Sequence, residues 1–214
     1  DGGVIAISSG ENHSLFIKND GSLWAMGYNE KGQLGDGTTS NRHSPVKIIN
    51  DHVVAIAAGI KHSLFVKSDG SLWAMGGNTD GQLGDGTATD RHSPVQVVAS
   101  GVVAVKSGGY HSLFIKDDGS LWAMGANFAG QLGDGTTFQR LNPVQIIVSG
   151  VKALAGGETH SLFVKTDDTL WAMGGNSFGQ LGDGTTTGRN SPAKVNTPTP
   201  QLITAHPQNR TVMA

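Results

Sequence analysis

The sequence predicts an all-β protein, a β-propeller built from four blade-like repeats of four antiparallel strands. Three observations predict it. Histidine, tryptophan and proline each recur every 49 residues, as at His13 and His62 or at Trp24 and Trp73. Each repeat contains four short apolar segments separated by glycine-rich turns, and no window of eleven residues has a helical period free of Gly or Pro. Four short strands in a unit of about 40–50 residues are typical of a propeller blade.

The repeats divide the chain into four units and a tail. The units cover residues 1–49, 50–98, 99–147 and 148–196 without an insertion, and the tail covers 197–214. Glycine occupies 32 of the 214 residues, and this composition allows either a disordered chain or a turn-rich β protein. However, 24 of the 49 positions carry the same residue in all four units. A disordered tract does not keep apolar positions in register, so the repeats favour the β protein.

The second unit shows how each element is predicted. Its predicted strands, in chain order, are residues 53–57, 62–67, 72–75 and 94–98. Ser68-Asp69-Gly70-Ser71 is a tight-turn sequence that joins the second and third strands as a hairpin. Residues 81–87 form a glycine-rich loop before the fourth strand. Pro94 is expected at the entrance of that strand, where its missing N–H does least harm.

Both faces of each sheet are predicted to be covered. Leu64 and Val66 point to one face of the second strand and Phe65 points to the other, so both faces are apolar. Stacking of the sheets against one another covers both faces at once. The small residues 57–59 suit an inner strand near the axis, and Trp73 with Phe65 is expected to fill the space between blades.

Four motifs of the second unit recur in all four units, with single departures in the last unit. They read Gly59-x-x-His62-Ser63-Leu64, Asp69-Gly70-x-Leu72-Trp73, Gly76-x-Asn78-x-x-Gly81-Gln82-Leu83-Gly84-Asp85-Gly86-Thr87 and Pro94-Val95. This pattern closely resembles the regulator of chromosome condensation repeat. The resemblance covers residues 1–196 and implies a propeller that usually closes with seven blades. We therefore expect the four units to be part of a larger ring.

The two ends of the repeat region look complementary. The first unit begins with the strand 4–7 without a preceding Pro-Val strand, and the last unit ends with residues 192–195 without a following partner. Strand exchange between such ends would hide both sheet edges, so self-association through open propeller edges is one expected contact. The tail opens with a Thr-Pro-Thr-Pro linker at 197–200, and residues 201–212 resemble the start of a bacterial immunoglobulin-like domain.

The repeated polar residues invite metal-binding interpretations, which their chemistry does not favour. One aspartate in each glycine-rich loop falls short of the six to eight oxygen ligands that calcium takes, and no helix or lysine follows to make a phosphate cradle. Each histidine is expected to open its strand and hold the glycine turn by a hydrogen bond. We assign structural roles, and no metal, cofactor or catalytic site, to the following repeated residues: His13, His62, His111, His160, Trp24, Trp73, Trp122, Trp171, Asp36, Asp85, Asp134 and Asp183.

Composition argues against several kinds of partner. The chain has 15 basic and 17 acidic residues, a net charge of −2, so no basic field is available for nucleic acid. No apolar run approaches the roughly 18 residues of a membrane span. There is no cysteine, which excludes disulfides, thiolate nucleophiles and cysteine-based zinc sites.

The candidate binding residues are aromatic residues outside the repeat pattern. Eight of the 13 aromatic residues are the repeated Trp and Phe, and the other five occupy loop positions that vary between units: Tyr28, Tyr110, Phe128, Phe138 and Phe178. Rigid aromatic side chains on loops are typical of interface hot spots. The alternative is that they fold back over the blade edge. Phe128 and Phe178 occupy nearby offsets in successive units, which would place them in one patch.

The leading functional interpretation is a non-enzymatic module that acts as a protein-interaction scaffold. The alternative is a structural spacer or adhesin domain of a bacterial secreted or cell-surface protein, and the tail favours a location outside the cell or at its surface over the cytoplasm. The resembled family includes a nucleotide exchange factor for a small GTPase and a plant ultraviolet photoreceptor. Uniform 49-residue spacing leaves no room for the inserted loops on which exchange depends, and the photoreceptor's Gly-Trp-Arg-His signature is absent. Exchange-factor-like activity and enzymatic activity are therefore less favoured.

Overall fold

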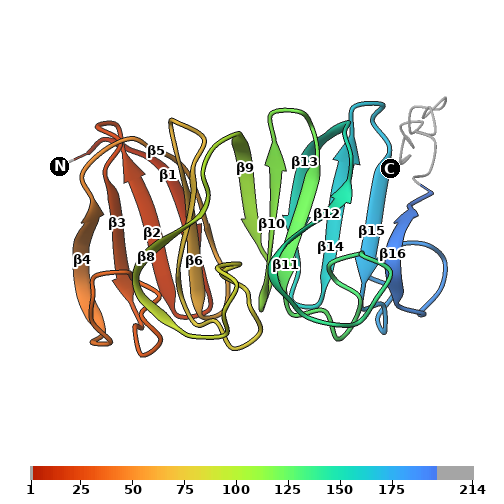
Figure 1. Ribbon diagram of the computed structural model, residues 1–214, viewed down its shortest axis with the longest axis horizontal. Helices are drawn as coiled ribbons and strands as arrows, with labels where there is room; N and C mark the ends of the chain where they lie inside the picture. The colour runs from red at the N-terminus through yellow and green to blue at the C-terminus, as the bar shows by residue number, and fades with distance from the viewer. Residues whose placement is uncertain (1, 197–214) are drawn as a thin grey trace, which may run out of the picture.

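The computed structural model describes residues 2–196, which form sixteen β-strands and no helix. Residues 2–196 therefore contain no helix that could cross a membrane. The strands form four separate four-stranded antiparallel sheets, which we call blades 1 to 4 (Figure 1). This arrangement confirms the predicted propeller fold.

Each blade is built from consecutive strands, and their bounds are as follows. Blade 1 contains β1 (Val4–Ser9), β2 (His13–Lys18), β3 (Leu23–Gly27) and β4 (Arg42–Ile49). Blade 2 contains β5 (Val53–Ala58), β6 (His62–Lys67), β7 (Leu72–Gly76) and β8 (Arg91–Val98). Blade 3 contains β9 (Val102–Ser107), β10 (His111–Lys116), β11 (Leu121–Gly125) and β12 (Arg140–Ile147). Blade 4 contains β13 (Val151–Gly156), β14 (His160–Lys165), β15 (Leu170–Gly174) and β16 (Arg189–Lys194).

The first strand of every blade is the inner one. Strand β5 contacts both β1 and β9, and β9 contacts β13, so these four strands lie next to one another. Small residues allow this approach: the backbone N of Ala58 donates to Ser8 Oγ at 3.1 Å across two inner strands. The four blades stand side by side in an arc, with blade 1 at one end and blade 4 at the other (Figure 1).

The fourth strand of each blade begins earlier than we expected. In blade 2, β8 starts at Arg91, so Pro94 lies inside the strand and not at its entrance. Two facts explain why proline is tolerated there. Strand β8 pairs only with β7 and is an edge strand, and Pro94 lies where the register shifts, between the pairs Ala74–Val95 and Gly76–Arg91. Edge strands and bulges are where a sheet accepts a residue without an N–H.

We expected the first and last units to have complementary ends that could exchange a strand, but the structure differs. Each unit supplies all four strands of its own sheet, so no strand from another unit is needed to complete blade 1 or blade 4. What the two terminal blades leave uncovered is a sheet face. Ile7, on the outward face of blade 1, is 80% exposed, whereas its equivalent Ile56 in blade 2 is 9% exposed.

The core lies between blades. The cluster between blades 1 and 2 joins the face of blade 1 that carries Leu15 and Ile17 to the face of blade 2 that carries Ile56, Phe65 and Met75. Equivalent clusters lie between blades 2 and 3 and between blades 3 and 4. We call the face of a blade that meets the preceding blade its leading face and the other its trailing face. Burial of these apolar faces is the main force that holds the arc together.

Candidate interaction face

The longest loops of all four blades emerge on one side of the arc. This side carries the β1–β2 turns and the β3–β4 loops, because alternate strand ends of an antiparallel sheet meet at the same edge. In blade 1 these segments are residues 10–12 and 28–41, between the strands given above. The long loops run along the lower edge of Figure 1. We call this side the loop face, and the opposite side, which carries the β2–β3 hairpins, the hairpin face.

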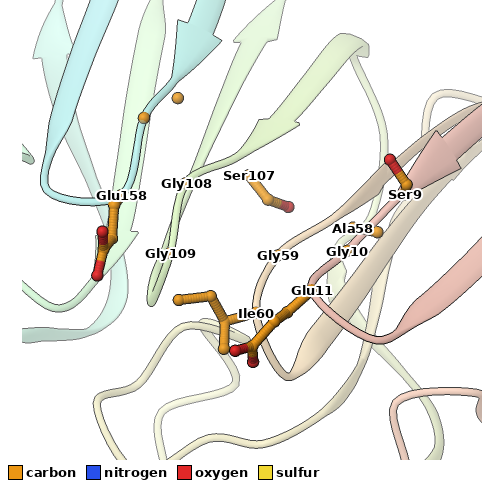
Figure 2. A pocket seen from close by; sticks show the side chains of 12 residues that line it. Ser9, Gly10, Glu11, Ala58, Gly59, Ile60, Ser107, Gly108, Gly109 and Glu158 are labelled. Carbon is orange, nitrogen blue, oxygen red and sulfur yellow. The ribbon is translucent and has the colours of Figure 1, made fainter. Parts of the chain in front are cut away.

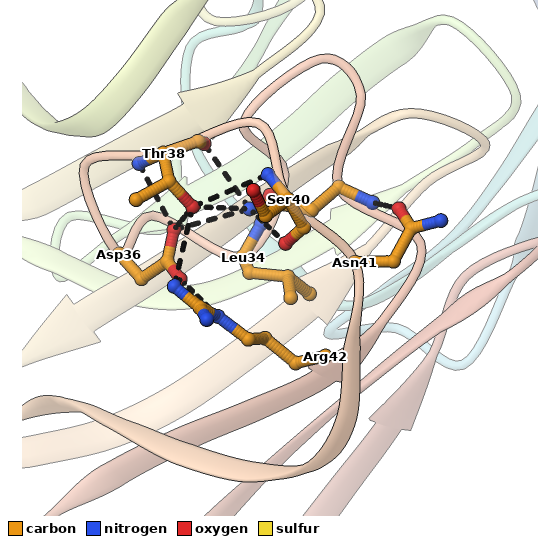
Figure 3. A network of polar contacts seen from close by, with 7 residues as sticks. Leu34, Asp36, Thr38, Ser40, Asn41 and Arg42 are labelled. Carbon is orange, nitrogen blue, oxygen red and sulfur yellow. Dashed lines mark hydrogen bonds and ion pairs between the residues drawn. The ribbon is translucent and has the colours of Figure 1, made fainter.

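A hydrogen-bond network holds each long loop in shape (Figure 3). In blade 1, the Asn29 side chain accepts from the backbone N of Leu34 at 2.9 Å and donates to Asp36 Oδ1 at 3.1 Å. Asp36 Oδ1 also accepts from the backbone N and the hydroxyl of Thr38, at 3.0 and 2.7 Å. Its other oxygen accepts from Arg42 Nε at 2.6 Å. One buried asparagine and one carboxylate therefore tie the loop to itself and to the start of β4.

The same network recurs around Asp85, Asp134 and Asp183. Burial raises the pKa of Asp85, but hydrogen bonds from Thr87 and Arg91 outweigh that effect and leave its pKa below the ordinary value. Both carboxylate oxygens are occupied by donors from the chain. No group of three or more His, Cys, Asp or Glu side chains within residues 2–196 is placed to hold a metal ion. The aspartates therefore act as acceptors for loop donors.

The five unrepeated aromatic residues all lie on the loop face, in two different environments. Tyr28 and Tyr110 are half-buried, and the Tyr28 hydroxyl donates to Glu30 at 2.5 Å. Phe128, Phe138 and Phe178 extend into solvent, with exposed fractions of 65, 74 and 94%. These phenylalanines therefore do not fold back over the blade edge. Phe128 and Phe178 come from the long loops of neighbouring blades 3 and 4, and their role in binding stays a prediction.

A shallow hollow of about 520 Å³ opens near the axis, where the inner strands of all four blades end (Figure 2). Half of its twelve lining residues are glycine, so much of its wall is backbone. Three larger side chains border it: Glu11, Ile60 and Glu158. The backbone N of Ile60 donates to the carbonyl of Gly109 at 3.1 Å, which joins the turns of blades 2 and 3. These carboxylates were not predicted from the sequence, because only aromatic residues were selected among the positions that vary between units.

The repeated histidines take a different partner from the one we expected. The backbone carbonyl of His62 does accept from Gly59 N at 2.9 Å, which closes the turn. The imidazole, however, points into the next blade, where its Nε2 lies 3.0 Å from Ser112 Oγ. Gly59 leaves room for the ring, because a Cβ there would lie 2.2 Å from His62 Cε1. The turn glycine therefore makes space for an imidazole that bonds across the blade boundary.

The geometry sets the protonation state of the buried histidines. Ser63 Oγ donates to the carbonyl of Gln33 at 2.7 Å, so it accepts from His13 Nε2, 2.8 Å away. His13 is therefore neutral with its proton on Nε2, and its buried Nδ1 has no hydrogen-bond partner within residues 2–196. Burial lowers the pKa of His13 to about 4 and that of His62 to about 3. The bond from His13 to Ser63 joins two blades, and a structural role for the repeated histidines stays a prediction.

The repeated tryptophans lie at the rim of the blade boundary. Trp73 is half-buried and stacks on the fully buried Phe65, with ring centroids 6.2 Å apart and planes within 5°. Lys67 Nζ lies 5.1 Å from the ring centroid, and the indole N–H donates to Ser71 Oγ at 2.9 Å. Phe65 therefore fills the space between blades, while Trp73 covers the edge of that space.

The chain also matches known proteins in sequence and in structure. Residues 1–213 match the family described as the RCC1-like domain. The chain belongs to the RCC1-like domain family. Among solved structures, human WBSCR16 is 25% identical with a TM-score of 0.83, over 92% of this chain and 54% of that chain. Prp20p from Saccharomyces cerevisiae is 21% identical with a TM-score of 0.81, over 91% of this chain and 50% of that one.

This RCC1-like chain spans about half the length of the solved relatives it matches. A second structure of the yeast protein, called yeast RCC1 (Prp20) and bound to Kap60, is 24% identical with a TM-score of 0.79, over 94% of this chain and 51% of that one. The first yeast structure is described together with binding to Gsp1p and histones. Those partners are properties of the yeast protein. The residues 197–214, where the sequence suggested an immunoglobulin-like domain, lie outside the described part of the chain.

Proposed function

We propose that this RCC1-like chain is a non-enzymatic protein-interaction module whose loop face contacts the partner. The observation that carries this proposal is the exposure of Phe128, Phe138 and Phe178 on loops that are themselves rigidly held. All five unrepeated aromatic residues lie on the loop face, and none of them lies on the hairpin face. The relatives support binding in general, since the yeast protein is described with three protein partners.

Exposed phenylalanine side chains favour association because their burial in a partner removes apolar surface from water. Aromatic anchors also lose little conformational entropy on binding, because they have only two side-chain torsions. The loops are pinned before any partner arrives: Asn127 donates to Asp134 at 3.0 Å and to the carbonyl of Phe138 at 3.1 Å, and accepts from Leu132 N at 2.9 Å. A preorganised loop avoids the ordering cost that weakens binding by flexible loops.

The hollow near the axis suggests that the partner has a basic side chain in addition to its apolar groups. Glu11 and Glu158 border the hollow from blades 1 and 4, and both are exposed. A lysine or arginine side chain of the partner would meet two carboxylates there, and charge complementarity of this kind improves specificity and the association rate. A protein segment with apolar residues and at least one basic residue therefore fits the loop face.

The arrangement of polar groups supports a binding role over catalysis. The repeated Asp, Arg, Asn and His side chains are used in bonds that hold loops and blades together. The four β3–β4 loops have the same length in every blade, so none is enlarged into the kind of wedge on which nucleotide exchange in the resembled family depends. The exposed side chains of Phe128, Phe138 and Phe178 are not used in this way.

The proposal is tested by removing the three phenylalanine rings together. The immobilised chain captures partners from an extract, quantitative mass spectrometry identifies the most enriched protein, and its dissociation constant is measured with purified components. The triple variant Phe128→Ala, Phe138→Ala, Phe178→Ala is expected to weaken binding at least about tenfold, with an unchanged melting temperature. The matched control is Val148→Ala, an exposed apolar residue between β12 and β13 on the hairpin face. Equal binding by the triple variant and the wild type would overturn the proposal.

A further inference from the structure

Blade 3 departs from the other three blades at three positions of the loop face. It carries Tyr110 in its β9–β10 turn, and Phe128 and Phe138 in its β11–β12 loop. Three of the five unrepeated aromatic residues therefore lie on one blade. The other blades have only polar residues at these positions: Asn12, Glu30 and Ser40 in blade 1, Lys61, Thr79 and Thr89 in blade 2, and Thr159, Ser177 and Thr187 in blade 4.

Hydrogen bonds place these three aromatic residues in one row across blade 3. The carbonyl of Tyr110 accepts from the backbone N of Ala126 at 2.8 Å, so the turn lies beside the start of the long loop. The buried Asn127, which directly precedes Phe128, donates to the carbonyl of Phe138 at 3.1 Å. Phe128 and Phe138 are exposed, and Tyr110 is half-buried. We call the row of these three aromatic residues the blade 3 track.

The blade 3 track leads to the hollow near the axis. Tyr110 directly follows Gly109, which lines that hollow together with Ile60 of blade 2 and Glu158 of blade 4 (Figure 2). A Cβ at Gly109 would lie 3.2 Å from Ile60 Cδ1 and 3.2 Å from Glu158 Cγ, so both side chains lie against this glycine. One apolar and one acidic side chain therefore border the inner end of the track.

The chemistry of the hollow favours a basic group at this inner end. Its lining residues, all within residues 2–196, include Glu11 and Glu158 but no lysine, arginine or histidine. Ser107 also lines the hollow, and its hydroxyl oxygen is buried without a hydrogen-bond partner in that part of the chain. A lysine or arginine side chain brings several N–H donors and a positive charge to these oxygens.

We propose that the blade 3 track binds a short linear segment of a partner protein, which places apolar side chains along the track and a lysine or arginine in the hollow beside Glu158. This inference rests on the proposed function and assigns the contact to one blade. Blade 3 stands between blades 2 and 4, where Lys61 and Thr159 take the position of Tyr110 (Figure 1). A single row of aromatic side chains between polar neighbours fits an extended segment better than a broad apolar surface.

The experiment uses a phage-displayed library of random peptides as its probe, panned on the 214-residue chain. We expect the enriched peptides to share apolar residues, aromatic or aliphatic, followed or preceded by a lysine or arginine at one end. Synthetic copies of these peptides then give dissociation constants by fluorescence anisotropy. A selection that enriches no peptides of this composition would overturn the proposal.

Substitutions taken from the repeats separate the blade 3 track from the rest of the loop face. Tyr110→Thr, Phe128→Ser and Phe138→Thr each introduce the residue that blade 4 has at the equivalent position, so the melting temperature should not change. Each should weaken peptide binding about tenfold. The matched control Tyr28→Ala removes the half-buried tyrosine of blade 1, introduces the residue of blade 3 and should change binding less than about twofold. Equal effects of Tyr110→Thr and Tyr28→Ala would refute the track.

A charge reversal tests where the basic residue of the segment lies. Glu158→Lys, a change in an exposed residue, should weaken peptide binding at least about tenfold. A peptide whose basic residue is replaced by glutamate should recover most of that loss on the variant, and no recovery would contradict the placement in the hollow. The proposed function is tested separately. A captured partner that binds the triple phenylalanine variant weakly but Tyr110→Thr normally would support the loop face and refute the track.

Discussion

His13 and Ser63 are 50 residues apart in the sequence, and His13 Nε2 lies 2.8 Å from Ser63 Oγ across the boundary of two blades. The serine hydroxyl in turn donates a hydrogen bond to the carbonyl of Gln33 at 2.7 Å. This pair shows how the repeat works: the same local sequence supplies a donor to the blade that follows and an acceptor to the blade before. Every internal boundary of the arc contains this contact.

Removal of a buried histidine should destabilise the fold. His62→Ala deletes a fully buried ring and its bond to Ser112, so we expect a loss of about 2–4 kcal/mol in the free energy of unfolding. The control His160→Ala removes the equivalent half-buried ring of blade 4, whose following blade is absent from residues 2–196, and should cost less than about 1 kcal/mol. Urea denaturation of both variants checks this. Equal costs would mean that the cross-blade bond contributes little.

Stability should fall as the pH drops below the ordinary histidine pKa. Burial lowers the pKa of His13 to about 4, and burial with neighbouring histidines lowers those of His62 and His111 to about 3. The unfolded chain therefore binds more protons than the folded chain between about pH 6.5 and pH 4, which favours unfolding there. The contribution of these histidines to stability should be constant above that window. Each buried histidine contributes a slope of up to about 1.4 kcal/mol per pH unit.

The assignment of this slope to histidine is checked with His62→Ala. Urea unfolding of the wild type and the variant at several pH values between 7 and 4.5 should show a shallower dependence in the variant, by about one proton. The loop aspartates, whose pKa values are lowered, lose their contribution only below about pH 4. An unchanged slope in His62→Ala would show that other groups take up the protons.

The loop carboxylates should matter more for stability than exposed carboxylates do. Asp85→Ala leaves Arg91 and the Asn78 amide without their charged acceptor, and we expect a loss of about 2–3 kcal/mol. Asp51→Ala, a change in an exposed residue between β4 and β5, should cost less than about 0.5 kcal/mol. Thermal unfolding at neutral pH compares the two. Similar costs for both variants would contradict the structural role of the loop network.

Calcium should leave the melting temperature unchanged. Both oxygens of Asp36 accept bonds from Thr38, Asn29 and Arg42, so a metal would have to displace donors that are already in place. A ligand that binds only the folded chain raises its stability, so thermal unfolding with and without calcium detects such binding. A rise of several degrees would show that the loops reorganise into a calcium site.

The methionine-on-glycine contact can be measured with a matched pair of variants. Gly84 and Gly182 occupy equivalent positions, and both have positive φ. Mutation of either glycine to alanine strains the backbone, which should lower the free energy of unfolding by about 1–2 kcal/mol. Gly84→Ala also places a Cβ 2.3 Å from Met124 Sδ, which adds about 1–3 kcal/mol. Gly182→Ala meets nothing nearer than 3.3 Å. Chemical denaturation at low protein concentration should therefore show the larger loss for Gly84→Ala, and equal losses would refute the packing argument.

Local patterns in the sequence were enough to predict the strands and turns. The 49-residue period predicted four sheets, and the Asp-Gly turns predicted the hairpins, as at Gly70 with φ of 76°. Asp168 occupies the equivalent hairpin position of the last unit, and it adopts a positive φ of 65° as well. The predicted start of the fourth strand was wrong. We placed Pro94 at the strand entrance, but β8 is an edge strand with a register shift at Pro94, and this depends on sheet pairing that the sequence does not show.

Only the tertiary structure decided which groups meet across blades. The sequence led us to expect that His62 would bond its own turn, 3 residues away, whereas the structure places its Nε2 3.0 Å from Ser112 Oγ in the next blade. It allowed Phe178 to fold back or to extend, and the structure places it in solvent. Periodicity and turn chemistry depend on neighbours along the chain, so the sequence determined them. Partners 50 residues apart depend on how one sheet stacks on the next, which only the packed structure determines.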